Sequence, residues 1–408
     1  MLNHPVDRAT HSGGAAALAA ACASIFWPGA FIFAFPGVMG PHWQDLFHVS
    51  RAAVGQSLFF VLAAVGIFMF LTGRWQEKVG PRPLVFLGAV LCGGSTILVG
   101  RASSIWMIYG WAFLMGISSS LVYIPALTVV QKWYPGRKGL ASGLVNMAFA
   151  LSAAVMGPLF GWALVKLGST SMTGLFGLCA LIAGISASCF IRLPARGQGS
   201  LSQQGADRAL SLGAAESLHT RVFWLIWFTW ALAGAGGIAM VTLSVSFGLA
   251  QGLAMHEAVL ILTAFNVTNG ASRLITGYLS DRVGRNLTMS VTFLSAGAAY
   301  LLMPHLNHIV AWSVLSAVVG FGFGTLFAVS GPLVSDCFGL AHFGTIFGLV
   351  FTAYGFFSGA FGPWLSGYVL DATGGDFGLV FAYLGGGFLV AAVLIWFAQP
   401  KRALPQPV

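Results

Sequence analysis

The chain has 408 residues, of which 57% are hydrophobic and only 7% are charged, and its mean hydropathy is +0.86. Soluble globular chains carry about 25% charged residues, so this composition excludes an ordinary soluble protein and indicates an integral membrane protein. The net charge of +9 is also compatible with a nucleic-acid partner. The placement of the charges along the chain has to decide whether they serve nucleic-acid binding or orientation in a membrane.

Apolar runs of spanning length recur along the whole chain. A membrane-spanning helix needs about 20 apolar residues, whereas a strand of an outer-membrane barrel needs only about 10, so the long runs exclude a barrel. The sequence predicts an all-α integral membrane protein with twelve transmembrane helices. The predicted spans are residues 15–39, 51–73, 83–101, 105–131, 139–166, 171–192, 221–250, 257–279, 287–304, 309–335, 343–370 and 377–398.

The basic residues divide unevenly between the two sides of the membrane. With loops numbered from the N-terminus, fifteen Lys and Arg residues fall on one side, and only Arg51, Arg101 and Lys166 fall on the other. Short cytoplasmic loops carry the excess of basic residues in membrane proteins. We therefore expect the protein to lie in the plasma or cell inner membrane, with both termini in the cytoplasm. The lipid bilayer is the expected partner of the chain, and no nucleic-acid partner is expected.

Other chemistry has little support in the sequence. The five cysteines fall in or beside apolar runs without close pairing, which indicates neither a disulfide framework nor a metal site. The HExxH and GxSxG motifs and the phosphate-binding glycine loop are not found, so we expect no enzyme activity, no cofactor and no metal. The first apolar run is too long for the core of a signal peptide and is expected to remain as a span.

An internal repeat connects the two halves of the chain. GRWQEKVG at Gly73–Gly80 recurs as GYLSDRVG at Gly277–Gly284 with an offset of 204, and GLASGL at Gly139–Leu144 recurs as GTIFGL at Gly344–Leu349 with an offset of 205. Half the chain length is 204 residues. A repeat of this length predicts two six-helix bundles related by a parallel duplication, as in transporters that rock about a central site.

The repeat and the composition together predict the domain boundaries. Residues 1–192 and 221–408 are expected to form the two bundles, the second with a short tail. The segment 193–220 is rich in Gly, Ser, Gln and Ala, which is typical of a linker. We expect it to lie in the cytoplasm and to contain at most one short surface helix.

The repeated motif resembles the cytoplasmic signature of the major facilitator superfamily, in which a glycine, an acid, a base and a second glycine follow at fixed spacing. The glycines permit a tight turn and close helix contact, and the acid can cap a neighbouring helix. The signature residues are Gly73, Glu77, Lys78 and Gly80 in the first half and Gly277, Asp281, Arg282 and Gly284 in the second.

Two further features are similar to one branch of that superfamily, the monocarboxylate transporters and oxalate/formate antiporters. They are the sequence KWYPGRKGLASGL at Lys132–Leu144 and the placement of Arg273 four residues before Gly277. In those families this arginine contacts the substrate carboxylate, so the resemblance implies a carboxylate transporter. Oxalate antiporters add a lysine in the eleventh helix, and the run 344–368 has none. This difference favours a monocarboxylate over a dicarboxylate.

The residues around Arg273 support the same expectation independently. Asn266, Asn269, Arg273 and Gly277 share one face of a predicted helix, and Arg273 lies eight residues from Asp281. That is about 12 Å into a hydrocarbon layer whose half-thickness is about 15 Å. A guanidinium so deep costs about 3 kcal/mol or more, and it matches a carboxylate with two parallel hydrogen bonds. The alternatives are that Arg273 snorkels to the surface and that the asparagines only bond across a helix interface.

Further residues of a substrate site can be suggested from their depth in the membrane, counted in residues from the nearest charged boundary. Tyr123 lies nine residues before Lys132, and Asn146 lies eight residues after Lys138, so both are about 12 to 14 Å from a charged boundary. Tyr354, in the eleventh predicted span, is a weaker candidate. Tyr123 could instead anchor the protein at the membrane interface, and Asn146 could serve close helix packing.

The sequence therefore predicts a secondary active transporter that moves a small monocarboxylate, such as lactate or pyruvate, by alternating access. Its expected partners are the organic anion and a co-transported proton. An antiporter that exchanges two carboxylates would share nearly every feature and stays open. A drug or cation exporter of the same superfamily would require an acid in the cavity, and all ten Asp and Glu residues fall in predicted loops or tails. The sequence carries no signal for the oligomeric state.

Overall fold

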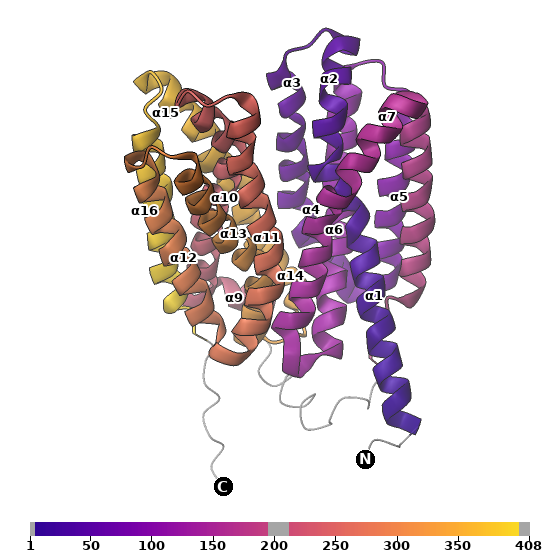
Figure 1. The fold of residues 1–408 in the computed structure, drawn as a ribbon. Helices are drawn as coiled ribbons and strands as arrows, with labels where there is room; N and C mark the ends of the chain where they lie inside the picture. Colours follow the sequence, from indigo (N-terminus) through magenta and orange to yellow (C-terminus); the bar gives the residue numbers. More distant parts are fainter. Residues whose placement is uncertain (1–4, 195–211, 400–408) are drawn as a thin grey trace. The chain divides into compact units, whose positions relative to one another are not determined.

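The computed structural model describes residues 5–194 and 212–399, and the regular structure in these ranges is helical throughout (Figure 1). The described chain forms two compact units. The first, here called the N-unit, takes residues 5–135, 144–194 and 347–355, and the second, the C-unit, takes 136–143, 212–346 and 356–399. Most of the expected linker at 193–220 lies outside the described residues.

The helices of the N-unit follow one another through short connections, in indigo to magenta in Figure 1. The last of them is broken at Gly168, whose backbone has φ 77° and ψ 167°, so one continuous segment contains two predicted spans. The elements are α1 (Pro5–Phe33), α2 (Phe35–Phe47), α3 (Arg51–Gly55), α4 (Ser57–Val79), α5 (Pro81–Val99), α6 (Ile105–Trp133) and α7 (Lys138–Phe190), whose first residues belong to the C-unit.

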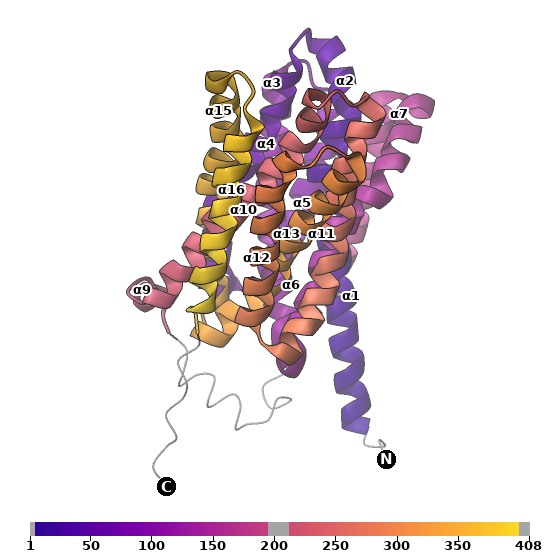
Figure 2. The same cartoon turned by 60° about the vertical axis from the view of Figure 1, so that its left-hand side comes forward.

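The C-unit has the same succession of long helices, best followed in the rose, orange and yellow ribbons of Figure 2. A short turn, η1 (Pro135–Arg137), precedes α7. The elements of the C-unit are α9 (Ala214–Leu218), α10 (Arg221–Ala250), α11 (Met255–Val283), α12 (Arg285–Leu302), η2 (Met303–His305), α13 (Ile309–Phe338), α14 (Phe343–Thr352), η3 (Ala353–Ser358), η4 (Ala360–Trp364), α15 (Leu365–Thr373) and α16 (Phe377–Trp396). Part of α14 and η3 belongs to the N-unit.

The described helices agree with the twelve predicted spans. Eleven stretches of the described residues are long and apolar enough to cross a membrane, and one of them, Pro135–Phe190, contains the break at Gly168 and therefore two spans. The span expected at 343–370 is not one regular α-helix, because η3 and η4 are π-helical. Pro363 lies within η4 and has no backbone N–H to donate, which accounts for part of this irregularity.

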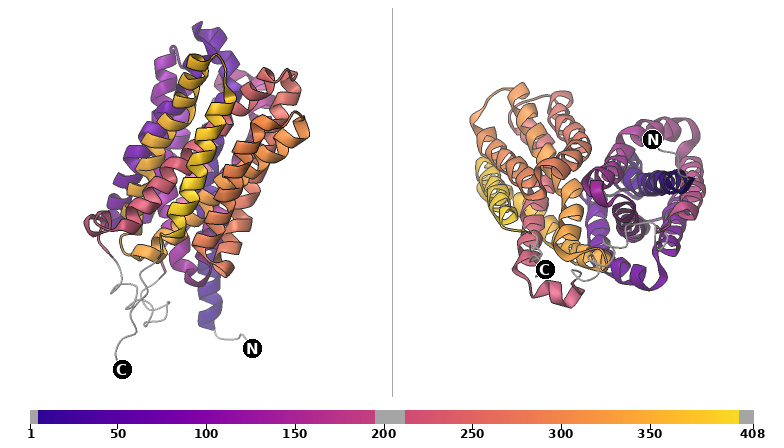
Figure 3. Two further views of the ribbon diagram at one scale, coloured as in Figure 1. Left: turned by 90° about the vertical axis from the view of Figure 1, so that its left-hand side faces the viewer. Right: turned by 90° about the horizontal axis from the view of Figure 1, so that it is seen from below.

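The duplication is evident from how the helices pack within each unit. Figure 3 shows these helices from the side and from below. In the N-unit α6 packs against α1, α4 and α5, and in the C-unit α13 packs against α10, α11 and α12. A Cβ atom on Gly116 of α6 would lie 2.5 Å from the carbonyl oxygen of Val61, and one on Gly320 of α13 would lie 2.3 Å from that of Phe265. Gly320 lies 204 positions after Gly116, and Phe265 lies 204 positions after Val61. The same close helix contact is therefore built twice.

The signature turns end α4 and α11 at glycines that need a left-handed backbone. Gly80 has φ 80° and Gly284 has φ 101°, a region that residues with a Cβ rarely adopt. In the C-unit the Asp281 carboxylate accepts hydrogen bonds from the backbone N–H groups of Gly139 (2.9 Å) and Leu140 (2.8 Å). Asp281 therefore caps the N-terminus of α7, where a negative charge is favoured by the helix dipole.

We expect Asp281→Asn to lower the stability of the folded protein by roughly 1 to 3 kcal/mol, because it removes the charge that caps α7 and pairs with Arg285. The measurement is the melting temperature of the purified protein in detergent. Asp371→Asn is the matched control, since Asp371 is exposed near the end of α15. Equal melting temperatures for the two variants would contradict the capping role.

Candidate functional site

Arg273 is buried in the middle of α11, with only 3% of the residue exposed. Its Nε and Nη2 atoms both donate to Oδ1 of Asn269, one turn earlier, at 3.3 Å each. Its guanidinium also lies over the ring of Phe327 on α13, 4.6 Å from the ring centroid. A cation over an aromatic face is stabilised by about 2 kcal/mol when both groups are desolvated. The side chain is therefore held between α11 and α13 and does not extend to the surface of the protein.

The polar face predicted on α11 is only partly buried. Asn269 is half-buried beside Arg273, whereas Asn266 is exposed and no hydrogen bond to its side chain is seen among the described residues. The backbone at Arg273 is tightly packed as well, because a Cβ atom on Gly143 would lie 2.4 Å from the Arg273 carbonyl oxygen. Of the predicted site residues on this helix, Asn269 and Arg273 are together and Asn266 is apart from them.

The other three predicted site residues lie together in the N-unit. The Tyr123 hydroxyl on α6 donates to Oδ1 of Asn146 on α7 at 2.8 Å, and the two residues are 2% and 0% exposed. Phe351 stands between the two tyrosines: its ring lies 5.4 Å from that of Tyr123 and 6.1 Å from that of Tyr354. Phe149 completes the group at 6.2 Å from Tyr123. We call these five residues the Tyr123 cluster.

Three phenylalanines of these groups were missed by the sequence reasoning. They are Phe327, which supports the guanidinium, and Phe351 and Phe149 of the Tyr123 cluster. The chain contains 34 phenylalanines, so residue type alone does not single out these three. Phe351 could have been found through the repeat, because it follows Asn146 by 205 positions.

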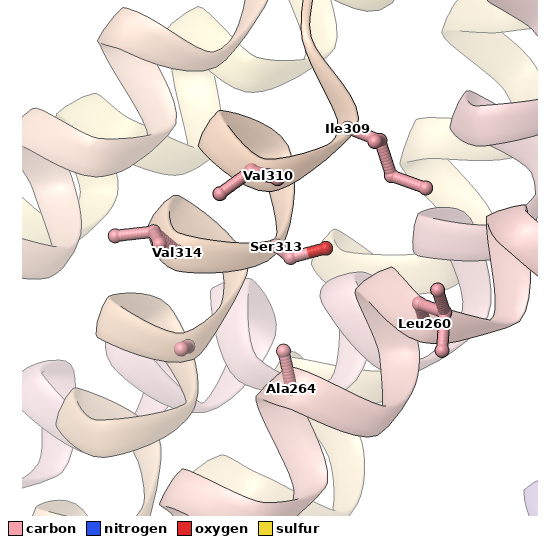
Figure 4. Close-up of a pocket in the computed structure, with 7 residues that line it drawn as sticks. Leu260, Ala264, Ile309, Val310, Ser313 and Val314 are labelled. Carbon is pink, nitrogen blue, oxygen red and sulfur yellow. The ribbon is translucent and has the colours of Figure 1, made fainter.

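An apolar cavity of about 280 Å³ lies between the early turns of α11 and α13 (Figure 4). Leu260, Val310 and Val314 on its rim are more than half exposed. The remaining lining residues are Ala264, Ile309, Ser313 and Ala317. None of the predicted site residues lines this cavity, and it offers an anion no charged or amide group. It is therefore not the candidate substrate site.

The Major Facilitator Superfamily model matches residues 16–261 and 237–408 of this chain. The oxalate:formate antiporter of Oxalobacter formigenes is 30% identical over 347 residues, which cover 82% of this chain and 78% of the antiporter. Human monocarboxylate transporter 11 is 28% identical over 356 residues, covering 84% of this chain and 73% of that protein. These relatives match the branch that the sequence motifs suggested.

Solved structures show the same fold at lower sequence identity. The proton:xylose symporter XylE superposes with a TM-score of 0.75 at 16% identity, over 96% of this chain and 97% of XylE. The E. coli fucose:proton symporter FucP superposes with a TM-score of 0.69, also at 16% identity, over 94% and 98% of the two chains. The family match, the relatives and the fold are those of multi-pass membrane transporters. The chain belongs to the Major Facilitator Superfamily.

Proposed function

We propose that this protein is a secondary active transporter that moves a small monocarboxylate, such as lactate or pyruvate, by alternating access. The observation that carries the proposal is the buried guanidinium of Arg273, held within a membrane-spanning helix against the neutral groups of Asn269 and Phe327. A cation in a medium of low dielectric constant attracts an anion strongly, and a guanidinium presents a planar fork that fits a carboxylate. Substrate binding would then neutralise a charge whose burial is costly.

The remaining site residues would orient the substrate. In this proposal Asn269 fixes the plane of the guanidinium, and the Tyr123 hydroxyl and the Asn146 amide meet the rest of the anion. Asn266 and Tyr354 would contact substrate on its way to or from the site. The aromatic rings of the Tyr123 cluster suit a short apolar substituent of the substrate. A small amphipathic anion matches this combination of a buried cation and aromatic surface.

Transport would follow from motion of the two repeats, residues 1–192 and 221–408, joined by the cytoplasmic linker 193–220. Superfamily members with parallel repeats expose a central site to each side of the membrane in turn. The fifteen-to-three distribution of basic residues supports a location in the plasma or cell inner membrane with both termini in the cytoplasm.

A second candidate function is the exchange of two carboxylates across the membrane. The observation that favours it is the similarity to a relative named as an oxalate:formate antiporter, at 30% identity. Exchange and proton-coupled transport use the same arginine in this proposal. They differ in whether the empty carrier can return across the membrane, and that difference is measurable.

Uptake of labelled lactate into proteoliposomes separates the two candidates. We expect an inwardly directed proton gradient to accelerate uptake several-fold over vesicles without a gradient, and a protonophore to remove the acceleration. The second condition uses vesicles loaded with unlabelled carboxylate and no gradient. Uptake that requires internal carboxylate and ignores the gradient would identify an exchanger. Vesicles that take up neither lactate nor pyruvate under either condition would contradict both candidates.

A further inference from the structure

Directly after the signature of the C-unit, the guanidinium of Arg285 is surrounded by oxygen atoms. The Nη1 atom of Arg285 donates to the Ser280 hydroxyl at 2.8 Å and pairs with the Asp281 carboxylate. Its Nε donates to Oδ2 of Asp336 on α13 at 3.1 Å. One cation at the start of α12 thus contacts three oxygen-bearing side chains, two on α11 and one on α13. Asp336 also pairs with Lys138 at 3.0 Å.

The corresponding positions of the N-unit keep oxygen-bearing side chains, but the position of the arginine is taken by a proline. Arg285 aligns with Pro81, and both residues begin a helix directly after a glycine of positive φ, Gly284 or Gly80. The three oxygen-bearing residues all have oxygen-bearing counterparts. At offsets of 204, 204 and 205, Ser280 aligns with Gln76, Asp281 with Glu77 and Asp336 with Gln131.

Four buried polar atoms in this region of the N-unit lack a hydrogen-bond partner among the described residues. Gln131, near the end of α6, is 0% exposed, and within the described residues neither its Oε1 nor its Nε2 forms a hydrogen bond. The same holds for Oε1 of Gln76 and for Oγ1 of Thr72, which is also 0% exposed. Thr72 and Gln76 lie one turn apart on α4, and α4 packs against α6. Buried polar groups are almost always hydrogen-bonded, so four such atoms near the same helix ends point to a bound ligand.

We propose that a small cluster of ordered water molecules, bound by Thr72, Gln76 and Gln131, replaces the guanidinium in the N-unit. The ligand must accept a hydrogen bond from the Gln131 Nε2 and donate to the amide oxygens of Gln76 and Gln131. Water does both, whereas a metal cation would satisfy only the oxygen atoms. Buried waters commonly make about three hydrogen bonds each to such groups, and the four atoms suffice for one or two molecules.

A neighbouring lysine does not take the place of Arg285. Lys132 interacts electrostatically with Glu77, but it aligns with Cys337 and not with Arg285. The consequence is an asymmetry between the two signatures. The oxygen atoms around Arg285 in the C-unit are satisfied within the chain, whereas the buried polar atoms of Thr72, Gln76 and Gln131 in the N-unit are satisfied by exchangeable solvent. We therefore expect faster hydrogen–deuterium exchange at the ends of α4 and α6 than at the corresponding ends of α11 and α13.

Two variants test the water site through melting temperatures of the purified full-length protein, without reference to transport. Gln131→Met replaces the amide with an apolar side chain of similar length. If water satisfies the amide, the variant loses those hydrogen bonds and melts at or below the temperature of the parent. If the amide is buried dry, removing it relieves a large penalty, and a melting temperature several degrees higher would overturn the proposal.

The double variant Pro81→Arg with Gln131→Asp rebuilds the arrangement of the C-unit in the N-unit. The new guanidinium is expected to displace the water and meet Glu77, Gln76 and the new carboxylate, so the melting temperature should rise by several degrees. Pro83→Arg, which adds the same charge at an exposed position, is the control. A double variant that is no more stable than this control would overturn the equivalence of the two sites. If the double variant does not fold, the result for Gln131→Met and the exchange rates still decide the question.

Discussion

Replacing Arg273 by glutamine is expected to reduce lactate uptake about 100-fold or more. The change removes the charge and one side of the planar fork while keeping a polar side chain of moderate length. Loss of a buried, hydrogen-bonded charge pair costs about 2 to 5 kcal/mol, and about 3 kcal/mol corresponds to a factor of roughly 100. Arg273→Lys should give an intermediate loss, because it keeps the charge and gives up the fork and the stacking on Phe327.

The control for Arg273→Gln is Arg101→Gln, which removes one positive charge from an exposed loop. Uptake by this control should equal that of the parent at the same protein density in the vesicles. The melting temperature of Arg273→Gln should stay near or above that of the parent, because a buried cation is removed. Transport by Arg273→Gln at the rate of the parent would reduce Arg273 to a packing residue.

Gly143→Ala is expected to destabilise the protein markedly, although it adds only one methyl group. The added Cβ would lie 2.4 Å from the carbonyl oxygen of Arg273, and 3.4 Å from both the carbonyl carbon of Arg273 and the Cα of Gly277. The backbone atoms it meets cannot rotate away as a side chain can, so the helices must separate. Overpacking of this kind costs typically 1 to 3 kcal/mol, and the shift at Arg273 should lower lactate uptake in parallel.

The matched control is Gly161→Ala, in the same helix, where an added Cβ meets no heavy atom within 4 Å. Alanine favours the helix over glycine by about 1 kcal/mol, so this control should be neutral or slightly stabilising. The melting temperatures of the two purified variants are compared. Their lactate uptake rates are compared in vesicles of the same composition. Equal behaviour of the two variants would show that the close contact at Gly143 does not constrain the helix that carries Arg273.

Much of the fold could be predicted because the bilayer imposes a simple rule on sequence. A helix that spans hydrocarbon must be long and apolar, so the spans could be read directly from the runs of apolar residues. The repeat could be read from charge and glycine at fixed spacing, and it reappears as equivalent contacts at Gly116 and Gly320. The π-helical course of η3 and η4 was not predicted, because a single extra residue in a turn leaves the apolar pattern almost unchanged.

The site was predictable where a residue is out of place in a membrane and hidden where it is not. Arg273 stands out because a guanidinium deep in a span is rare. Counting depth also proposed Tyr123 and Asn146, and they share a hydrogen bond in the structure, although depth alone cannot say which helix faces meet. Phe327 could not be singled out, because apolar side chains carry no signal of this kind in a chain rich in phenylalanine. Gln131 was overlooked since it lies close to a helix end, where polar residues are usual.

The central claim is that Arg273 recognises a carboxylate, and ligand-induced stabilisation of the purified protein tests it most directly. A ligand that binds only the folded protein raises its melting temperature in proportion to RT ln(1 + [L]/Kd). We predict that lactate raises the melting temperature of the parent and of Arg101→Gln, that the uncharged isostere lactamide does not, and that Arg273→Gln responds to neither. An equal shift by lactate in the parent and in Arg273→Gln would contradict the claim.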